Sequence, residues 1–180
     1  MTGLETDRLL LRELCLDDVE AVQAWDADPV VARWLFNEPR TREETLAYLR
    51  TGEEATRADP RRVYDWAVVE KATGRVVGRV GFGRGEDPRD ASLWYLMRPD
   101  RQGRGYAVEA ARLAMKFGFR ELALHRMWVD VDPENVASIR VAEKLGMRRE
   151  ALHLENVFVK GAWRGTAILA ILAREWNQGR

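Results

Sequence analysis

The feature that most constrains this chain is a glycine-bearing turn between a strand-like segment and a strongly patterned helix. The strand is expected over 91–97, and the helix over 106–119 places its apolar residues near one face. Gly103 and Gly105 lie between the two, and glycine lets the backbone come close to a ligand. A helix N-terminus adds unpaired N–H groups and the positive end of a dipole. The turn therefore predicts a phosphate site or, on the plainer interpretation, a tight turn with a basic surface.

The rest of the chain alternates between strand and helix signals, with no repeat and no internal linker. Thr41 and Glu44 have the spacing of a capping box, and Gly146 follows the last helix as a C-cap. The order predicts an α/β fold, one domain over 1–180, with a mixed sheet of about seven strands and about four helices. The strands are expected at 9–14, 64–70, 75–82, 91–97, 126–131, 149–159 and 166–175, and the helices at 19–25, 41–57, 106–119 and 137–145.

Composition excludes several classes of protein. With 46% hydrophobic and 32% charged residues among 180, the chain is expected to form a core, and its single cysteine excludes a disulfide-stapled mini-fold. No apolar run approaches the roughly 20 residues that span a bilayer, and the first twelve residues do not resemble a signal peptide. We therefore expect a cytoplasmic protein without membrane contact. The 29 basic and 29 acidic residues balance, which argues against nucleic-acid binding.

A second polar segment leads from the strand at 126–131 into the helix that follows it. It contains Asp132-Pro133-Glu134-Asn135 and, three residues later, Ser138. Taken alone, Asn135 fits a helix N-cap and Ser138 a residue of the first helical turn. Neither this segment nor any other has His, Cys and Asp residues at metal-ligand spacing, so we expect no metal site.

Three motifs in this order resemble one known family. Gln102-x-x-Gly105-x-Ala107 matches the signature Gln/Arg-x-x-Gly-x-Gly/Ala for acyl-CoA, and 132–138 followed by 143–147 looks like the second half of the same fold. The segments 5–12 and 175–176 are similar to the RimJ/RimL-like branch, which acetylates ribosomal-protein N-termini. The chain thus resembles the GNAT superfamily of N-acetyltransferases over essentially its whole length.

The resemblance implies acetyl-CoA as the co-substrate. The backbone of the strand end would pair with the pantetheine arm, the following loop would hold the pyrophosphate, and the 135–138 segment would approach the sulfur. Lys144 could reach a phosphate, although a solvated helix residue is the more ordinary interpretation. The implied cofactor-binding residues are Met97, Arg98, Gln102, Gly103, Arg104, Gly105, Tyr106, Ala107, Asn135 and Ser138.

The chain departs from the family at positions that often carry catalysis. The usual glutamate of the third inner strand corresponds to Ser92, a common tyrosine corresponds to Ala142, and the final strand has Gly165 and Leu169 at usual aspartate and tyrosine positions. The expected catalytic residues are instead Ser138 and Glu155. Asp130 and His153 are further candidates, and for both a structural role is the more ordinary interpretation. Trp34-Leu35-Phe36 follow the first helix, where similar enzymes have one wall of the acceptor groove.

The chemistry favours an α-amine as the acceptor. An α-amine with a pKa of about 7.7–8.0 is on the order of a tenth neutral at pH 7, whereas a lysine is under a thousandth neutral. A site without a strand carboxylate therefore handles an α-amine more easily. We expect transfer of an acetyl group to a protein or peptide N-terminus. The alternatives are acetylation of a small-molecule amine and a CoA-binding module without activity; the sequence leaves a homodimer open.

Overall fold

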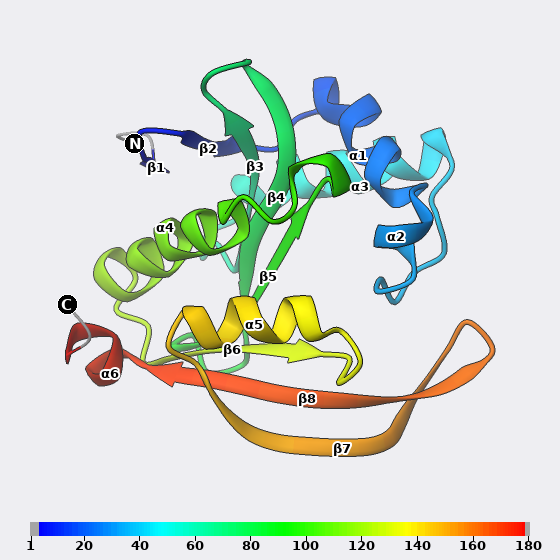
Figure 1. Cartoon of the computed structure of the whole chain (residues 1–180). Coiled ribbons are helices and arrows are strands. Elements are labelled where there is room, and N and C mark those ends of the chain that lie inside the picture. The colour runs from blue at the N-terminus through cyan, green and yellow to red at the C-terminus, as the bar shows by residue number, and fades with distance from the viewer. Residues whose placement is uncertain (1–3, 179–180) are drawn as a thin grey trace.

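One mixed sheet with helices on both faces forms the frame of the molecule (Figure 1). The computed structural model describes residues 4–178. Within them eight strands follow the order β1-β2-β3-β4-β5-β6-β8-β7; β5 and β6 pair in parallel, and every other neighbouring pair is antiparallel. The strands are β1 Leu4–Glu5, β2 Leu9–Glu13, β3 Val63–Glu70, β4 Arg75–Arg84, β5 Asp90–Met97, β6 Arg126–Val131, β7 Arg148–Val159 and β8 Ala162–Leu172.

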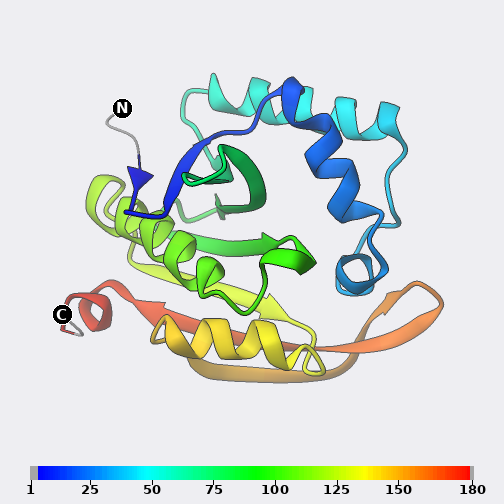
Figure 2. The same ribbon diagram turned by 45° about the horizontal axis from the view of Figure 1, so that its top comes forward.

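The helices divide between the two faces of this sheet (Figure 2). One core cluster joins α4 and α5 to the central strands, and its fully buried members include Phe82 and Met115. The second cluster joins α1, α2 and α3 to the opposite face through Val22, Trp25 and Leu49. The helices are α1 Val19–Asp26, α2 Pro29–Ala32, α3 Arg42–Thr56, α4 Tyr106–Glu121, α5 Val136–Lys144 and α6 Ala173–Gln178, with short 3-10 helices η1 Leu16–Asp18 and η2 Pro99–Arg101.

The predicted α/β class and most predicted elements are confirmed. Thr41 and Glu44 form the capping box of α3, with Glu44 N 3.2 Å from Thr41 Oγ1 and Thr41 N 2.7 Å from Glu44 Oε2. Gly146 follows α5 with φ +86°, a left-handed conformation that favours glycine at a helix end. These local signals position α4 and α5 beside the strands that carry the site.

The last predicted strand was too long. It was expected to reach Glu175, but β8 ends at Leu172 and Glu175 lies in α6. The Leu172 N–H donates to the Glu175 carboxylate at 2.8 Å, and this contact ends the ladder and starts the helix. The sequence also predicted no helix at 29–32, where Asp28 caps α2 and proline occupies its first turn.

Candidate active site

The turn between β5 and α4 presents a row of open backbone N–H groups. Gly103 and Gly105 have φ +74° and +80°, and Gly105 is the N-cap residue of α4. No residue of the described chain accepts a hydrogen bond from the backbone N–H groups of 103–107. Donors at a helix N-terminus, open to the outside and backed by the helix dipole, suit an anion such as pyrophosphate.

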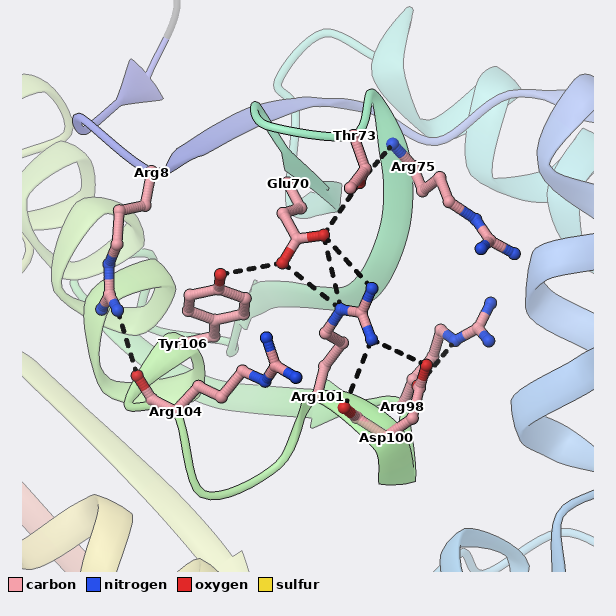
Figure 3. Close-up of polar contacts among 9 residues, drawn as sticks. All are labelled: Arg8, Glu70, Thr73, Arg75, Arg98, Asp100, Arg101, Arg104 and Tyr106. Carbon is pink, nitrogen blue, oxygen red and sulfur yellow. Dashed lines mark hydrogen bonds and ion pairs between the residues drawn. The ribbon is translucent and has the colours of Figure 1, made fainter.

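A buried carboxylate anchors this turn (Figure 3). The Glu70 side chain at the end of β3 is 6% exposed; it accepts hydrogen bonds from the Tyr106 hydroxyl and the Thr73 hydroxyl, each at 2.8 Å. Arg101 Nε lies 3.3 Å from Glu70 Oε1. Hydrogen bonds from Thr73 and Tyr106 hold the pKa of Glu70 below its usual value. Glu70 thus fixes both ends of the turn, a role that the sequence analysis missed.

The N-terminal segment fastens the same turn from the other side. Arg8 donates to the Glu109 carboxylate of α4 and, at 3.2 Å, to the carbonyl oxygen of Arg104. Its guanidinium also lies 4.8 Å from the ring centroid of Tyr106. Figure 3 also shows Asp100 beside the turn, where it pairs with Arg98 and with Arg101. The guanidinium groups make the mouth of the turn positive, as phosphate binding requires.

The two parallel strands separate beside this turn. β5 and β6 pair only from Asp90 with Arg126 to Ser92 with Trp128, and beyond this point the strands diverge (Figure 1). A cavity of about 700 Å³ fills the gap and extends from the turn to α2. An extended chain fits between two such strands, where it meets their unpaired backbone groups. The predicted cofactor residues that line the cavity are Met97, Gln102, Gly103, Gly105, Tyr106, Ala107, Asn135 and Ser138.

Two of the predicted cofactor residues lie outside the lining. These are Arg98, which pairs with Asp100 at 3.1 Å, and Arg104. Lys144 does line the cavity and is exposed, so either predicted role is compatible with its position.

A pair of hydroxyl groups marks the middle of the cavity. Asn135 caps α5 by accepting from the Ser138 N–H at 3.1 Å. The Ser138 hydroxyl donates to the Tyr95 oxygen at 3.1 Å, and the Tyr95 hydroxyl donates to the Ser138 carbonyl at 2.9 Å. Burial raises the pKa of Tyr95 to about 12, so this phenol stays protonated at neutral pH. Sequence reasoning missed Tyr95, whose only signal is its inward position in the alternating strand.

Near α2 the floor of the cavity is formed by the face of the sheet that packs against α1, α2 and α3. Asp65, Gly81 and Trp94 are directly paired on β3, β4 and β5. Because Gly81 has no side chain, the Trp94 indole lies across it; a Cβ there would come within 2.8 Å of the ring. The indole Nε1 donates to Asp65 Oδ1 at 3.0 Å. Trp94 and its neighbour Arg79 therefore form a fixed floor.

The wall above this floor is apolar, as predicted for 34–36. Trp34, Leu35 and Phe36 line the cavity together with Val30 and Val31 of α2. The tip of the β7–β8 hairpin meets α2 at the rim, where Lys160 Nζ donates to the Ala32 carbonyl at 2.6 Å (Figure 2). The cavity is thus bounded by α2 on one side and by the hairpin on the other.

Two carboxylates of the described chain line the cavity. Asp132 is ion-paired with Arg164 at 2.9 Å. Asp130 of β6 has no hydrogen bond or ion pair with any residue in the range 4–178. Its neighbours Val129 and Val131 are buried in the α4–α5 core, so Asp130 points to the same face as Trp94.

The structure separates Glu155 from the other predicted catalytic residue. Glu155 is exposed at an irregularity of β7 between His153 and Val157, with φ +46°, and it does not line the cavity. Ser138 does. Ser92 lies where β5 and β6 still pair, outside the lining, so on this face the β5 residues that meet the cavity are Trp94 and Leu96.

Comparison with known proteins shows the family to which this chain belongs. A family model described as an acetyltransferase (GNAT) domain matches residues 8–148, and the chain belongs to that family. It is 30% identical over 176 residues to YnaD of Bacillus subtilis, an uncharacterized N-acetyltransferase, covering 97% of this chain and 99% of that protein. It is 28% identical to spermidine N(1)-acetyltransferase of Escherichia coli, covering 92% and 87%. The chain is thus a GNAT-type N-acetyltransferase.

A solved structure agrees with this membership. A putative ribosomal-protein-serine acetyltransferase from Vibrio cholerae superposes with a TM-score of 0.79 at 26% identity, covering 94% of this chain and 97% of that one.

Among residues 4–178, no group of three His, Cys, Asp or Glu residues is placed to hold a metal ion. In the same range no helix has the length and apolar character needed to cross a membrane.

Proposed function

We propose that this chain transfers the acetyl group of acetyl-CoA to the α-amine of a protein or peptide N-terminus in the cytoplasm. One observation carries the proposal: a single cavity runs from the N–H-rich turn, past the separated strands, to the wall at 30–36. A thioester and an amine that enter from opposite ends meet in the middle, beside Ser138 and Tyr95. Proximity of this kind removes much of the entropic barrier.

The residues of the chain fit acetyl-CoA, which supplies the acetyl thioester. The open N–H groups of 103–107 bind the pyrophosphate, and the β5–β6 gap takes the extended arm. Ser138 and Tyr95 hold a proton at the point where the thiolate leaves, because the Tyr95 phenol stays protonated. Asp130 accepts the proton of the amine, since it is the cavity carboxylate without a described partner.

The acceptor end of the cavity favours an α-amine over a polyamine. A polyamine carries several cations and needs several free carboxylates, but Asp132 is already paired with Arg164 and only Asp130 is open among the described lining residues. A single carboxylate is sufficient to deprotonate an amine with a pKa near 8, because part of that amine is already neutral at pH 7. The spermidine N(1)-acetyltransferase of Escherichia coli, at 28% identity, keeps a polyamine as the second candidate.

An acceptor panel tests the proposal. Release of free CoA from acetyl-CoA is followed with N-terminally free peptides, the same peptides blocked at the N-terminus, and spermidine, and the products are identified by mass. We expect acetylation of the free peptides alone. Preferential acetylation of spermidine would replace the proposal with the second candidate, and release with no acceptor would refute both.

Binding of the co-substrate is tested separately by melting. CoA at about 100 times its dissociation constant should stabilise the protein by roughly 2.7 kcal/mol, while NAD and ATP should not. An equal shift with all three nucleotides would mean that the turn binds phosphates without recognising CoA.

A further inference from the structure

A second cationic group lines the cavity on the face of the sheet that carries Trp94. Arg79 of β4 lines the cavity, and its side chain is only 20% exposed. Val80 and Phe82 of the same strand are buried in the α4–α5 core, so by alternation Arg79 points to the face of Trp94. The guanidinium therefore belongs to the acceptor end of the cavity.

Most of the donors of Arg79 are not used by the protein. Nη1 bonds to the Tyr48 hydroxyl and lies 3.2 Å from Asp65 Oδ2. Nε and Nη2 donate to no residue in the described range 4–178. Neither nitrogen is among the fully buried polar atoms of this range that lack a partner, and Arg79 lines the cavity. A partly buried guanidinium with open N–H groups is costly unless a ligand completes it.

The surroundings of Arg79 leave part of its charge uncompensated. Asp65 is its nearest carboxylate, but it also accepts hydrogen bonds from the Tyr48 hydroxyl at 2.6 Å and from the Trp94 indole. Burial raises the pKa of Asp65 to about 7, and besides its ion pair with Arg79 this carboxylate serves the two other donors. Asp26, the other buried carboxylate nearby, is paired with Arg40.

We propose that Arg79 binds an oxygen atom next to the reacting amine of the acceptor, either a peptide carbonyl or a free α-carboxylate. The inference rests on the proposed function and deepens it, because it defines the acceptor as an α-amino acyl compound. Such a compound places its amine toward Asp130 on β6 and its oxygen toward Arg79 on β4, on either side of Trp94. Spermidine has no such oxygen.

Matched acceptors test the role of Arg79. Phenylalaninamide, phenylalanine and phenethylamine share the aromatic ring and the amine, but only the first two have the oxygen. In Arg79→Gln, kcat/KM should fall about 10- to 100-fold for the amide or the acid, as expected for a lost hydrogen bond to a charged group. It should change less than about threefold for phenethylamine. A larger fall for phenylalanine assigns the site to a carboxylate, and an equal or larger fall for the amide assigns it to a carbonyl.

Two further variants control for folding and charge. Arg84→Gln changes an arginine of the same strand that lies outside the cavity and donates to the Pro88 and Arg61 carbonyls. It should leave kcat/KM unchanged for all three acceptors. Arg79→Lys keeps the charge and loses the fork of donors, so it should restore only part of the preference. Because each ratio compares two acceptors on one preparation, a partly unfolded variant does not alter it. An equal fall for all three acceptors would overturn the proposal.

Calorimetry keeps this test independent of turnover. Phenylalaninamide is titrated into CoA-loaded protein and should bind the native chain more tightly than Arg79→Gln by the same 10- to 100-fold. Equal affinity for the two chains would overturn the role of Arg79, and so would failure of the native chain to bind the amide. Tight, Arg79-dependent binding without acetylation would refute the proposed activity and leave the binding role intact.

Discussion

Replacing Gly81 with alanine tests whether the floor of the acceptor site depends on a missing side chain. A Cβ at this position would lie 2.2 Å from the Tyr64 carbonyl oxygen and 2.8 Å from the Trp94 ring. The first atom belongs to the paired backbone of β3, so it yields only if the strand moves. We therefore expect a cost of about 3 kcal/mol, the upper end of the usual penalty for overpacking.

Gly83→Ala is the matched control, two residues along the same strand. A Cβ there meets the Trp94 ring at 3.6 Å, an ordinary contact, and alanine stabilises by about 0.4–1 kcal/mol through the unfolded chain. The two variants should differ by roughly 10 °C in melting temperature. Gly81→Ala should also weaken acceptor binding while CoA affinity is kept, because Trp94 is displaced and the turn is not. Equal melting temperatures for the two variants would refute the reasoning.

Three other changes have defined outcomes. Gly105→Val places a β-branched residue at φ +80°, so the CoA dissociation constant should rise about tenfold in calorimetry, whereas Gly161→Val, with the same strain at φ +76°, should leave it unchanged. Ser138→Ala should lower turnover roughly 10- to 100-fold with little change in CoA affinity; full turnover would leave Tyr95 as the proton donor. Burial raises the pKa of Asp65 above its unfolded value, so stability falls as pH rises from about 4 to 7. Asp65→Asn should flatten that fall in urea titrations, and an unchanged slope would contradict it.

Features that depend on neighbouring residues were predictable from the sequence. The capping box of Thr41 and Glu44, the left-handed Gly105 and the Asn135 cap each involve residues within a few positions of one another. Periodicity located most strands and helices for the same reason. The turn between β5 and α4, being local, was therefore predicted with its correct limits, from the strand end at Met97 to the helix start at Tyr106.

Features that depend on strand register were not predictable. Glu70 meets Tyr106 across 36 positions, and Tyr95 meets Ser138 across 43. Arg79 and Trp94 share the floor only because β4 and β5 pair in one register, in which Trp94 lies opposite Gly81. A shift by one residue would turn each side chain to the other face. Glu155 was predicted from its strand alone, and the irregularity of β7 places it outside the cavity.

The contact between Lys160 and the Ala32 carbonyl has a consequence for the size and shape of the acceptor. It joins segments 128 positions apart and ties the tip of the β7–β8 hairpin to α2 at one side of the rim. A protein acceptor of the proposed kind has to bring its N-terminus past this tied side. An extended N-terminal tail meets that requirement more easily than an amine in the middle of a folded surface.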